Sequence, residues 1–185
     1  MDESKKPKRK NLSPLTILVV VVLAVALWGL LTPSFSHPPV YQHQIQCTSN
    51  LKKIGAAIFI YANDNDGQFP PDLYTLVEQG SIPNDAKLFH CPCIRKEVPL
   101  AMSTFADRSA FRTDYWYYPG YSEDNPPSTQ TTETGIVTDK LGNHDAHPLG
   151  TGTILFADGH AQLFRGKEWY KNSGQAEPPP RNSRL

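Results

Sequence analysis

The chain has 185 residues, with 18 basic and 18 acidic side chains, so its formal net charge at pH 7 is zero. Five basic and two acidic residues fall within the first ten positions, which leaves 13 basic and 16 acidic residues beyond residue 31. Phosphate contacts require a clustered basic face, and this mildly acidic part of the chain has none. The composition therefore excludes nucleic acid as an expected partner.

An uncharged apolar run of 17 residues, Leu15 to Leu31, follows a basic leader at residues 1–11. As a helix it would reach about 26 Å at ~1.5 Å per residue, close to the ~30 Å hydrocarbon core of a bilayer, and a start at Leu12 would close the gap. The sequence therefore predicts a transmembrane helix over 12–31 that contacts the lipid bilayer.

The cations before this run predict a cytoplasmic N-terminus by the positive-inside rule. The expected protein is a single-pass signal-anchor protein of the inner membrane with a periplasmic C-terminal domain. A cleaved signal peptide is the alternative, although its apolar region is usually only about 7 to 15 residues long.

Residues 32–40 are rich in proline and predict a stiff spacer. Beyond it, apolar residues recur at the spacing of one helix face, which predicts an amphipathic helix from about Val40 to Asn63. The Asn63–Gly67 segment is typical of a turn. A weak calcium site there is an alternative, although Ala62 and Leu73 occupy the first and last ligand positions of an EF-hand loop.

A short helix is expected from Pro71 or Asp72 to Gln79. Four later runs of β-branched and aromatic residues predict strands, at 115–118, 135–138, 153–157 and 160–164. Asp158-Gly159 predicts a hairpin with a two-residue type I′ turn between the last two. The expected fold class is α+β, with a long helix packed on a small antiparallel sheet over residues 41–170 and a disordered tail at 171–185.

Two distant segments carry recognisable motifs. Residues 47–55 read Cys-Thr-Ser-Asn-Leu-Lys-Lys-Ile-Gly, and residues 156–160 read Phe-Ala-Asp-Gly-His. With Asp72-Leu-Tyr-Thr-Leu-Val-Glu and Asp85-Ala-Lys-Leu-Phe-His-Cys-Pro, they resemble the pseudopilin-like proteins of the type II secretion and prepilin class. The resemblance implies a non-catalytic envelope module without a cofactor, linked to secretion or surface assembly and to other envelope or secretion proteins.

The N-terminus departs from the prepilin signal of that family. Alignment on Thr16 places Pro14 at the glycine before the cleavage site, Leu15 at the phenylalanine, and Val19 at the glutamate that docks neighbouring subunits. The resemblance therefore implies a degenerate signal in a protein that is not cleaved and does not enter a pilus.

Three cysteines allow two interpretations. The resemblance implies a disulfide between Cys47 and Cys91, which leaves Cys93 over, and a domain outside the cytoplasm can keep such a bond. Zinc is the alternative, because it takes about four ligands and Cys91, Cys93, His90 and a helix cysteine could supply them.

Two histidine and aspartate segments suggest a second metal alternative. Imidazole and carboxylate groups suit a divalent metal or general acid–base chemistry, and the candidate residues are His144, His147, Asp158 and His160. The alternative function is a membrane-anchored metal-binding protein or metal-dependent hydrolase. No nucleophile motif or phosphate loop accompanies these residues, so no catalytic residue is predicted.

Overall fold

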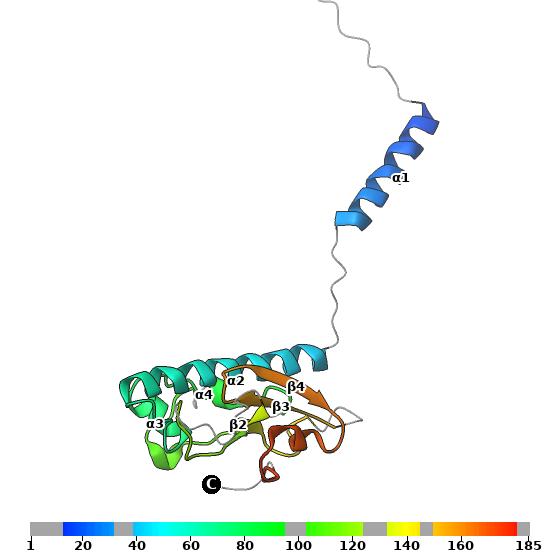
Figure 1. Ribbon diagram of the computed structural model, residues 1–185. Coiled ribbons are helices and arrows are strands. Elements are labelled where there is room, and N and C mark those ends of the chain that lie inside the picture. Colours follow the sequence, from blue (N-terminus) through cyan, green and yellow to red (C-terminus); the bar gives the residue numbers. More distant parts are fainter. Residues whose placement is uncertain (1–12, 32–38, 95–102, 124–132, 145–149, 181–185) are drawn as a thin grey trace, which may run out of the picture. The chain divides into compact units, whose positions relative to one another are not determined.

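The structure, a computed structural model, describes residues 13–31, 39–94, 103–123, 133–144 and 150–180 (Figure 1). The chain forms two compact units, Met1–His37 and Pro38–Leu185. The elements in chain order are α1 (Pro14–Leu31), α2 (Pro39–Asp64), α3 (Leu73–Glu78), α4 (Ala86–Phe89), η2 (Arg108–Ala110), β1 (Tyr115–Tyr117), β2 (Gly135–Asp139), β3 (Thr151–Phe156), β4 (Ala161–Arg165) and η4 (Trp169–Ser173).

Helix α1 is the only regular element described in the first unit. The Ser13 hydroxyl accepts a hydrogen bond from the Thr16 amide at 3.3 Å, as a residue that caps a helix N-terminus does. The positions aligned with the prepilin signal all lie in this helix: Pro14, Leu15, Thr16 and Val19. That they form a degenerate signal stays a prediction.

The predicted transmembrane helix requires a correction. Within the described ranges, no helix combines the length and the apolar character that crossing a membrane demands. The 18 residues of α1 extend about 27 Å at ~1.5 Å per residue, less than the ~30 Å hydrocarbon core. Leu12, which was expected to lengthen the span, lies outside the described residues. The transmembrane part of the fold class, the signal-anchor and the single-pass location in the inner membrane are therefore wrong.

Helix α2 organises the second unit and confirms the predicted amphipathic helix. Its inward side is a fully buried apolar stripe at helical spacing, formed by Cys47, Leu51, Ile54 and Ile58. Figure 1 shows α2 along one face of the sheet, where it contacts β3 and β4. At Gly55 an added Cβ would lie 2.8 Å from the Leu155 side chain, so glycine permits close packing of helix and sheet.

The turn that ends α2 is closed by its own backbone. The Gly67 amide donates to the Ala62 carbonyl at 2.9 Å, and the Asn65 side chain donates to the Tyr61 carbonyl at 2.8 Å. The predicted turn is therefore confirmed. The next helix, α3, begins where Asp72 was expected to favour a first turn, because the Asp72 carboxylate accepts the Thr75 amide at 2.9 Å.

The sheet has four antiparallel strands in the order β1-β2-β3-β4, at the four places predicted from sequence. The α+β fold with an antiparallel sheet is thus confirmed. The β3–β4 hairpin is also confirmed, with Thr151 opposite Arg165 and Leu155 opposite Ala161. Its turn differs from the predicted type I′ geometry, because residues 157–160 all lie outside the strands and only Gly159 among them has a positive φ, of 88°.

Residues after β4 cover the other face of the sheet. Trp169 packs with Ile154 and Phe156 in a second buried cluster. Its indole lies over Gly152, where any added Cβ would overlap the ring. The sheet is therefore enclosed between α2 on one side and the η4 segment on the other.

This packing orders part of the predicted tail. Ser173 is fully buried, and the Tyr118 hydroxyl donates to the Ala176 carbonyl at 2.7 Å. Residues 171–180 thus follow a defined path over the protein, and residues 181–185 lie outside the described part. Composition alone indicated disorder here because the aromatic side chain that holds the segment, Trp169, precedes it.

Candidate metal centre

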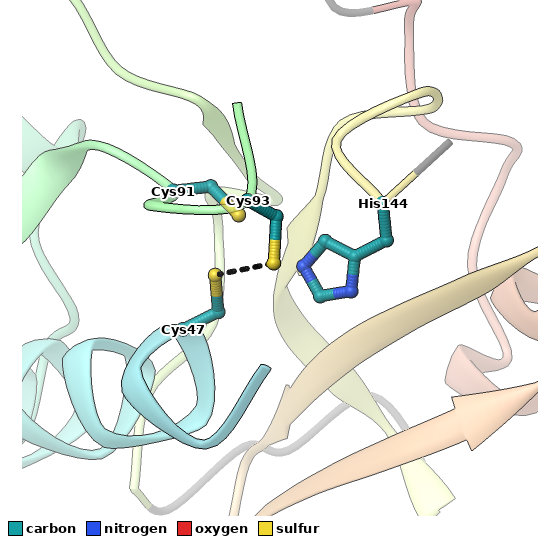
Figure 2. Close-up of side chains that lie close together, drawn as sticks. All are labelled: Cys47, Cys91, Cys93 and His144. Carbon is teal, nitrogen blue, oxygen red and sulfur yellow. Dashed lines mark hydrogen bonds between the residues drawn. The ribbon is translucent and has the colours of Figure 1, made fainter. Parts of the chain in front are cut away.

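Three cysteines and one histidine converge where β2 ends and β3 begins. Figure 2 shows Cys47 on α2, Cys91 and Cys93 in the loop after α4, and His144 in the turn after β2, with their side chains directed toward one another. Their possible ligand atoms all lie within 4.8 Å of one another, and the Sγ atoms of Cys47 and Cys93 are 4.0 Å apart. In the described ranges, no other group of three or more such residues is close enough to hold one ion.

The apolar stripe of α2 places the first ligand. Cys47 lies one turn before Leu51 on the inward side and is fully buried. Asn50, next to Leu51, is also buried, and its side-chain amide donates to the carbonyls of Lys87 and His90 at 3.1 and 3.2 Å. Helix α2 therefore supplies the Cys47 sulfur and, through Asn50, also anchors the segment that leads to Cys91 and Cys93.

Asp114, just before β1, fixes the Cys91 loop from the opposite side. Its Oδ2 accepts the Cys91 amide at 3.0 Å and lies 2.9 Å from Nδ1 of His90. The Asp114 amide in turn donates to the Phe89 carbonyl at 2.9 Å. His90, the predicted histidine ligand of a zinc site, is therefore engaged by a carboxylate and is not part of the cluster.

His144 takes the position that sequence assigned to His90. Its Nδ1 lies 3.1 Å from the Thr151 hydroxyl, so the nitrogen that faces Cys93 in Figure 2 is Nε2. The preceding residue, Asn143, donates to the Asp114 carbonyl at 2.6 Å and to Asp139 Oδ1 at 3.0 Å. The turn with the histidine is thus held to the same residue, Asp114, that holds the Cys91 loop.

Asp139 is a fully buried carboxylate beside the cluster. Its Oδ2 accepts the Thr153 amide at 2.6 Å and lies 3.4 Å from His144 Nε2. Burial raises the pKa of the Asp139 carboxyl, while His144 and the hydrogen bonds from Asn143 and Thr153 oppose that rise. A charge at this depth is stable only with such partners.

The three thiols differ in acidity. Hydrogen bonds from Cys47 and Cys91 lower the pKa of the Cys93 thiol, and His144 adds to this effect against the burial of the side chain. Burial raises the pKa of Cys91. The pKa of Cys47 is also raised, because its hydrogen bond with Cys93 and its burial outweigh the lowering by Cys91. The directions of these shifts make the half-buried Cys93 the most acidic of the three thiols.

This donor set suits zinc. Zn²⁺ binds Cys₃His sets tetrahedrally with Zn–S distances of ~2.3 Å, which separates two sulfurs by about 3.8 Å. The observed separation of 4.0 Å between Cys47 and Cys93 requires little movement. Four protein ligands fill a tetrahedral site and leave no open position for a substrate, as in structural rather than catalytic zinc sites.

The structure brings together the cysteines of the predicted zinc alternative, with His144 rather than His90 beside them, and zinc binding there stays a prediction. Cys47 and Cys91 are free thiols, and their pairing as a disulfide stays a prediction. The prediction of that bond also drew on a membrane anchor, and no helix in the described ranges could span a membrane. Three outer residues were missed entirely: Gln44, Asp139 and Thr151. They are ordinary polar residues in sequence, and only the fold brings them to the cluster.

The three described members of the other predicted metal set, His144, Asp158 and His160, do not converge. His147 lies outside the described residues. Asp158 and His160 pair with each other, Oδ1 to Nδ1 at 2.6 Å, in the hairpin turn at the far end of β3 from Thr151 and His144. A strand of this length separates the two ends by about 20 Å, so one ion cannot be shared. The calcium alternative at Asn63–Gly67 likewise gains no ligand cluster in the described part of the chain.

No family model, curated protein or solved structure matches the chain.

Proposed function

We propose that this protein is a non-catalytic zinc-binding module in which one Zn²⁺ joins α2, the Cys91 loop and the turn after β2. The observation that supports the proposal is the convergence of Cys47, Cys91, Cys93 and His144 within 4.8 Å. These residues come from three separate segments of the chain, so a bound ion would link the helix layer to the sheet. A relation to pseudopilins, with a role in secretion or surface assembly, stays part of the proposal on sequence resemblance alone.

The non-catalytic part of the proposal rests on burial and coordination. Cys47, Cys91 and His144 are buried, and only Cys93 is partly accessible. Catalytic zinc sites keep one position for water or substrate, whereas this site has four protein ligands. The hydrolase alternative has less support, because the exposed Asp158–His160 pair lies apart from the cluster.

Metal analysis of the purified chain tests the proposal. The wild-type protein should retain one zinc ion per chain after dialysis, and cobalt substitution should produce the visible absorption of a tetrahedral thiolate site. His144→Ala and Cys93→Ser should each lower zinc affinity by more than about 100-fold, since loss of an outer partner alone costs 10- to 100-fold.

His90→Ala is the matched control. His90 is the neighbour of Cys91 in sequence but contacts Asp114, so its loss should leave one zinc ion per chain. A wild-type chain that retains no metal, or one whose affinity falls with His90 rather than His144, would contradict the proposed site.

A further inference from the structure

A buried polar pair lies behind the metal centre. Thr151, the first residue of β3, and Gln44 on α2 are 5% and 3% exposed. The Gln44 Nε2 donates to Thr151 Oγ1 at 3.3 Å, and the same oxygen lies 3.1 Å from His144 Nδ1. Gln44 precedes Cys47 by three residues, so one helix supplies both a ligand and an outer contact of the site.

This contact can place the proton of the neutral His144 ring on Nδ1, because the Thr151 hydroxyl oxygen can accept it. A neutral imidazole has one N–H donor and one lone-pair acceptor, and a metal takes the lone pair. The hydroxyl oxygen of Thr151 can accept from both Gln44 and His144, because it has two lone pairs. With Nδ1–H donated to Thr151, the lone pair is on Nε2, which is the nitrogen directed at Cys93.

We propose that Thr151 is a positioning residue of the metal centre: it holds His144 in the Nδ1–H tautomer, directs Nε2 at the ion and so sets the zinc affinity. This inference rests on the proposed zinc site. Partners on the outer nitrogen of a metal-binding histidine fix the ring orientation and raise its basicity. Gln44 contributes by orienting the hydroxyl from the helix side.

Two substitutions separate this role from packing. Thr151→Val keeps the shape of the side chain but removes the hydroxyl, whereas Thr151→Ser keeps the hydroxyl and removes a methyl group. Competition with a chromophoric chelator should show a 10- to 100-fold loss of zinc affinity for Thr151→Val and a change within about threefold for Thr151→Ser. Equal losses in both variants would indicate a packing role and overturn the proposal.

Nitrogen chemical shifts of the His144 ring give a second measurement that requires no zinc. The zinc-free wild type should be mainly the Nδ1–H tautomer, and Thr151→Val should shift the ring toward the Nε2–H form. Unchanged zinc affinity and an unchanged tautomer in Thr151→Val would overturn the positioning role alone. A wild type that binds no zinc would overturn the proposed function and the affinity claim, and the tautomer shift would then decide whether Thr151 orients the ring.

Discussion

Two Asp–His pairs in this protein have the same chemistry and opposite surroundings. In the pair Asp158–His160 the side chains are 28% and 41% exposed and only 2.6 Å apart, whereas in Asp139–His144 they are 0% and 1% exposed and 3.4 Å apart. The shorter contact belongs to the exposed pair, yet the longer one borders the cysteine cluster. Burial and neighbouring ligands, rather than the closeness of the two groups, therefore distinguish the candidate site.

The difference follows from how each pair forms. Asp158 and His160 are two residues apart in a turn, so the local chain brings them together whatever the rest of the fold does. Asp139 and His144 also lie close in sequence, but Asp139 additionally accepts the Thr153 amide of the neighbouring strand. Only the second pair depends on the tertiary structure, and four predictions test that contrast.

The largest expected effect is that of zinc on stability. At free zinc about 1,000-fold above its dissociation constant, binding should raise the free energy of unfolding by about 4 kcal/mol. Denaturant titrations with and without zinc measure this gain. His144→Ala should abolish the gain and His160→Ala should keep it, so a loss in His160→Ala would reverse the assignment of the two pairs.

The second-largest effect is expected for removal of the carboxylate from each pair, because the loss of stability should differ strongly between the two variants. Asp139→Ala removes the acceptor of the buried Thr153 amide and one of the two acceptors of Asn143, and should destabilise the zinc-free protein by about 3 kcal/mol. Asp158→Ala removes an exposed pair and should cost less than about 1 kcal/mol. Urea unfolding measures the free energy of unfolding of both variants. Similar losses in the two would show that burial does not distinguish the two pairs.

The pH dependence of stability should reveal the buried carboxyl. Because burial raises the pKa of Asp139 in the folded state, the folded protein binds the proton more tightly than the unfolded chain. The stabilisation from that proton is complete below the unfolded pKa of about 3.9 and is lost as pH rises through the folded pKa. Zinc-free wild type should therefore lose stability relative to Asp139→Asn over this window. A parallel pH profile for the two proteins would contradict the raised pKa.

The smallest effect is expected at the hairpin turn. The His160 ring stacks on Phe156 with a centroid distance of 4.3 Å and pairs with an exposed carboxylate. His160→Ala should reduce stability by about 0.5 kcal/mol, the low end for stacked rings, and should leave zinc stoichiometry unchanged. Thermal melting and metal analysis of the same sample check both parts. A loss of zinc would place this histidine in a metal site after all.

Periodicity and turn chemistry were sufficient to predict most of the second unit. The spacing of Leu51, Ile54 and Ile58 fixes the helix, and the Asp158-Gly159 pair indicates the hairpin because these features are local in the chain. The transmembrane prediction needed a helix that starts at Leu12, whereas α1 begins at Pro14 and is only about as long as the apolar run itself.

The Cys/His cluster of the candidate metal centre could be predicted only in part, for a physical reason. Cys91 and Cys93 are neighbours, and a cysteine on the inward side of a helix is an evident third ligand. His144 joins them only because antiparallel pairing brings the end of β2 beside the start of β3. The sequence favours His90 because it is adjacent to Cys91. It does not reveal that the His90 ring already contacts the Asp114 carboxylate.

The indole of Trp169 over Gly152 also bears on the order of folding during synthesis. Trp169 follows every strand of the sheet and all four candidate zinc ligands in the chain. During synthesis, α2 and the four candidate zinc ligands therefore leave the ribosome before Trp169, the residue that covers Ile154 and Phe156. Until Trp169 has packed, the face of the sheet that carries Ile154 and Phe156 lacks its aromatic cover.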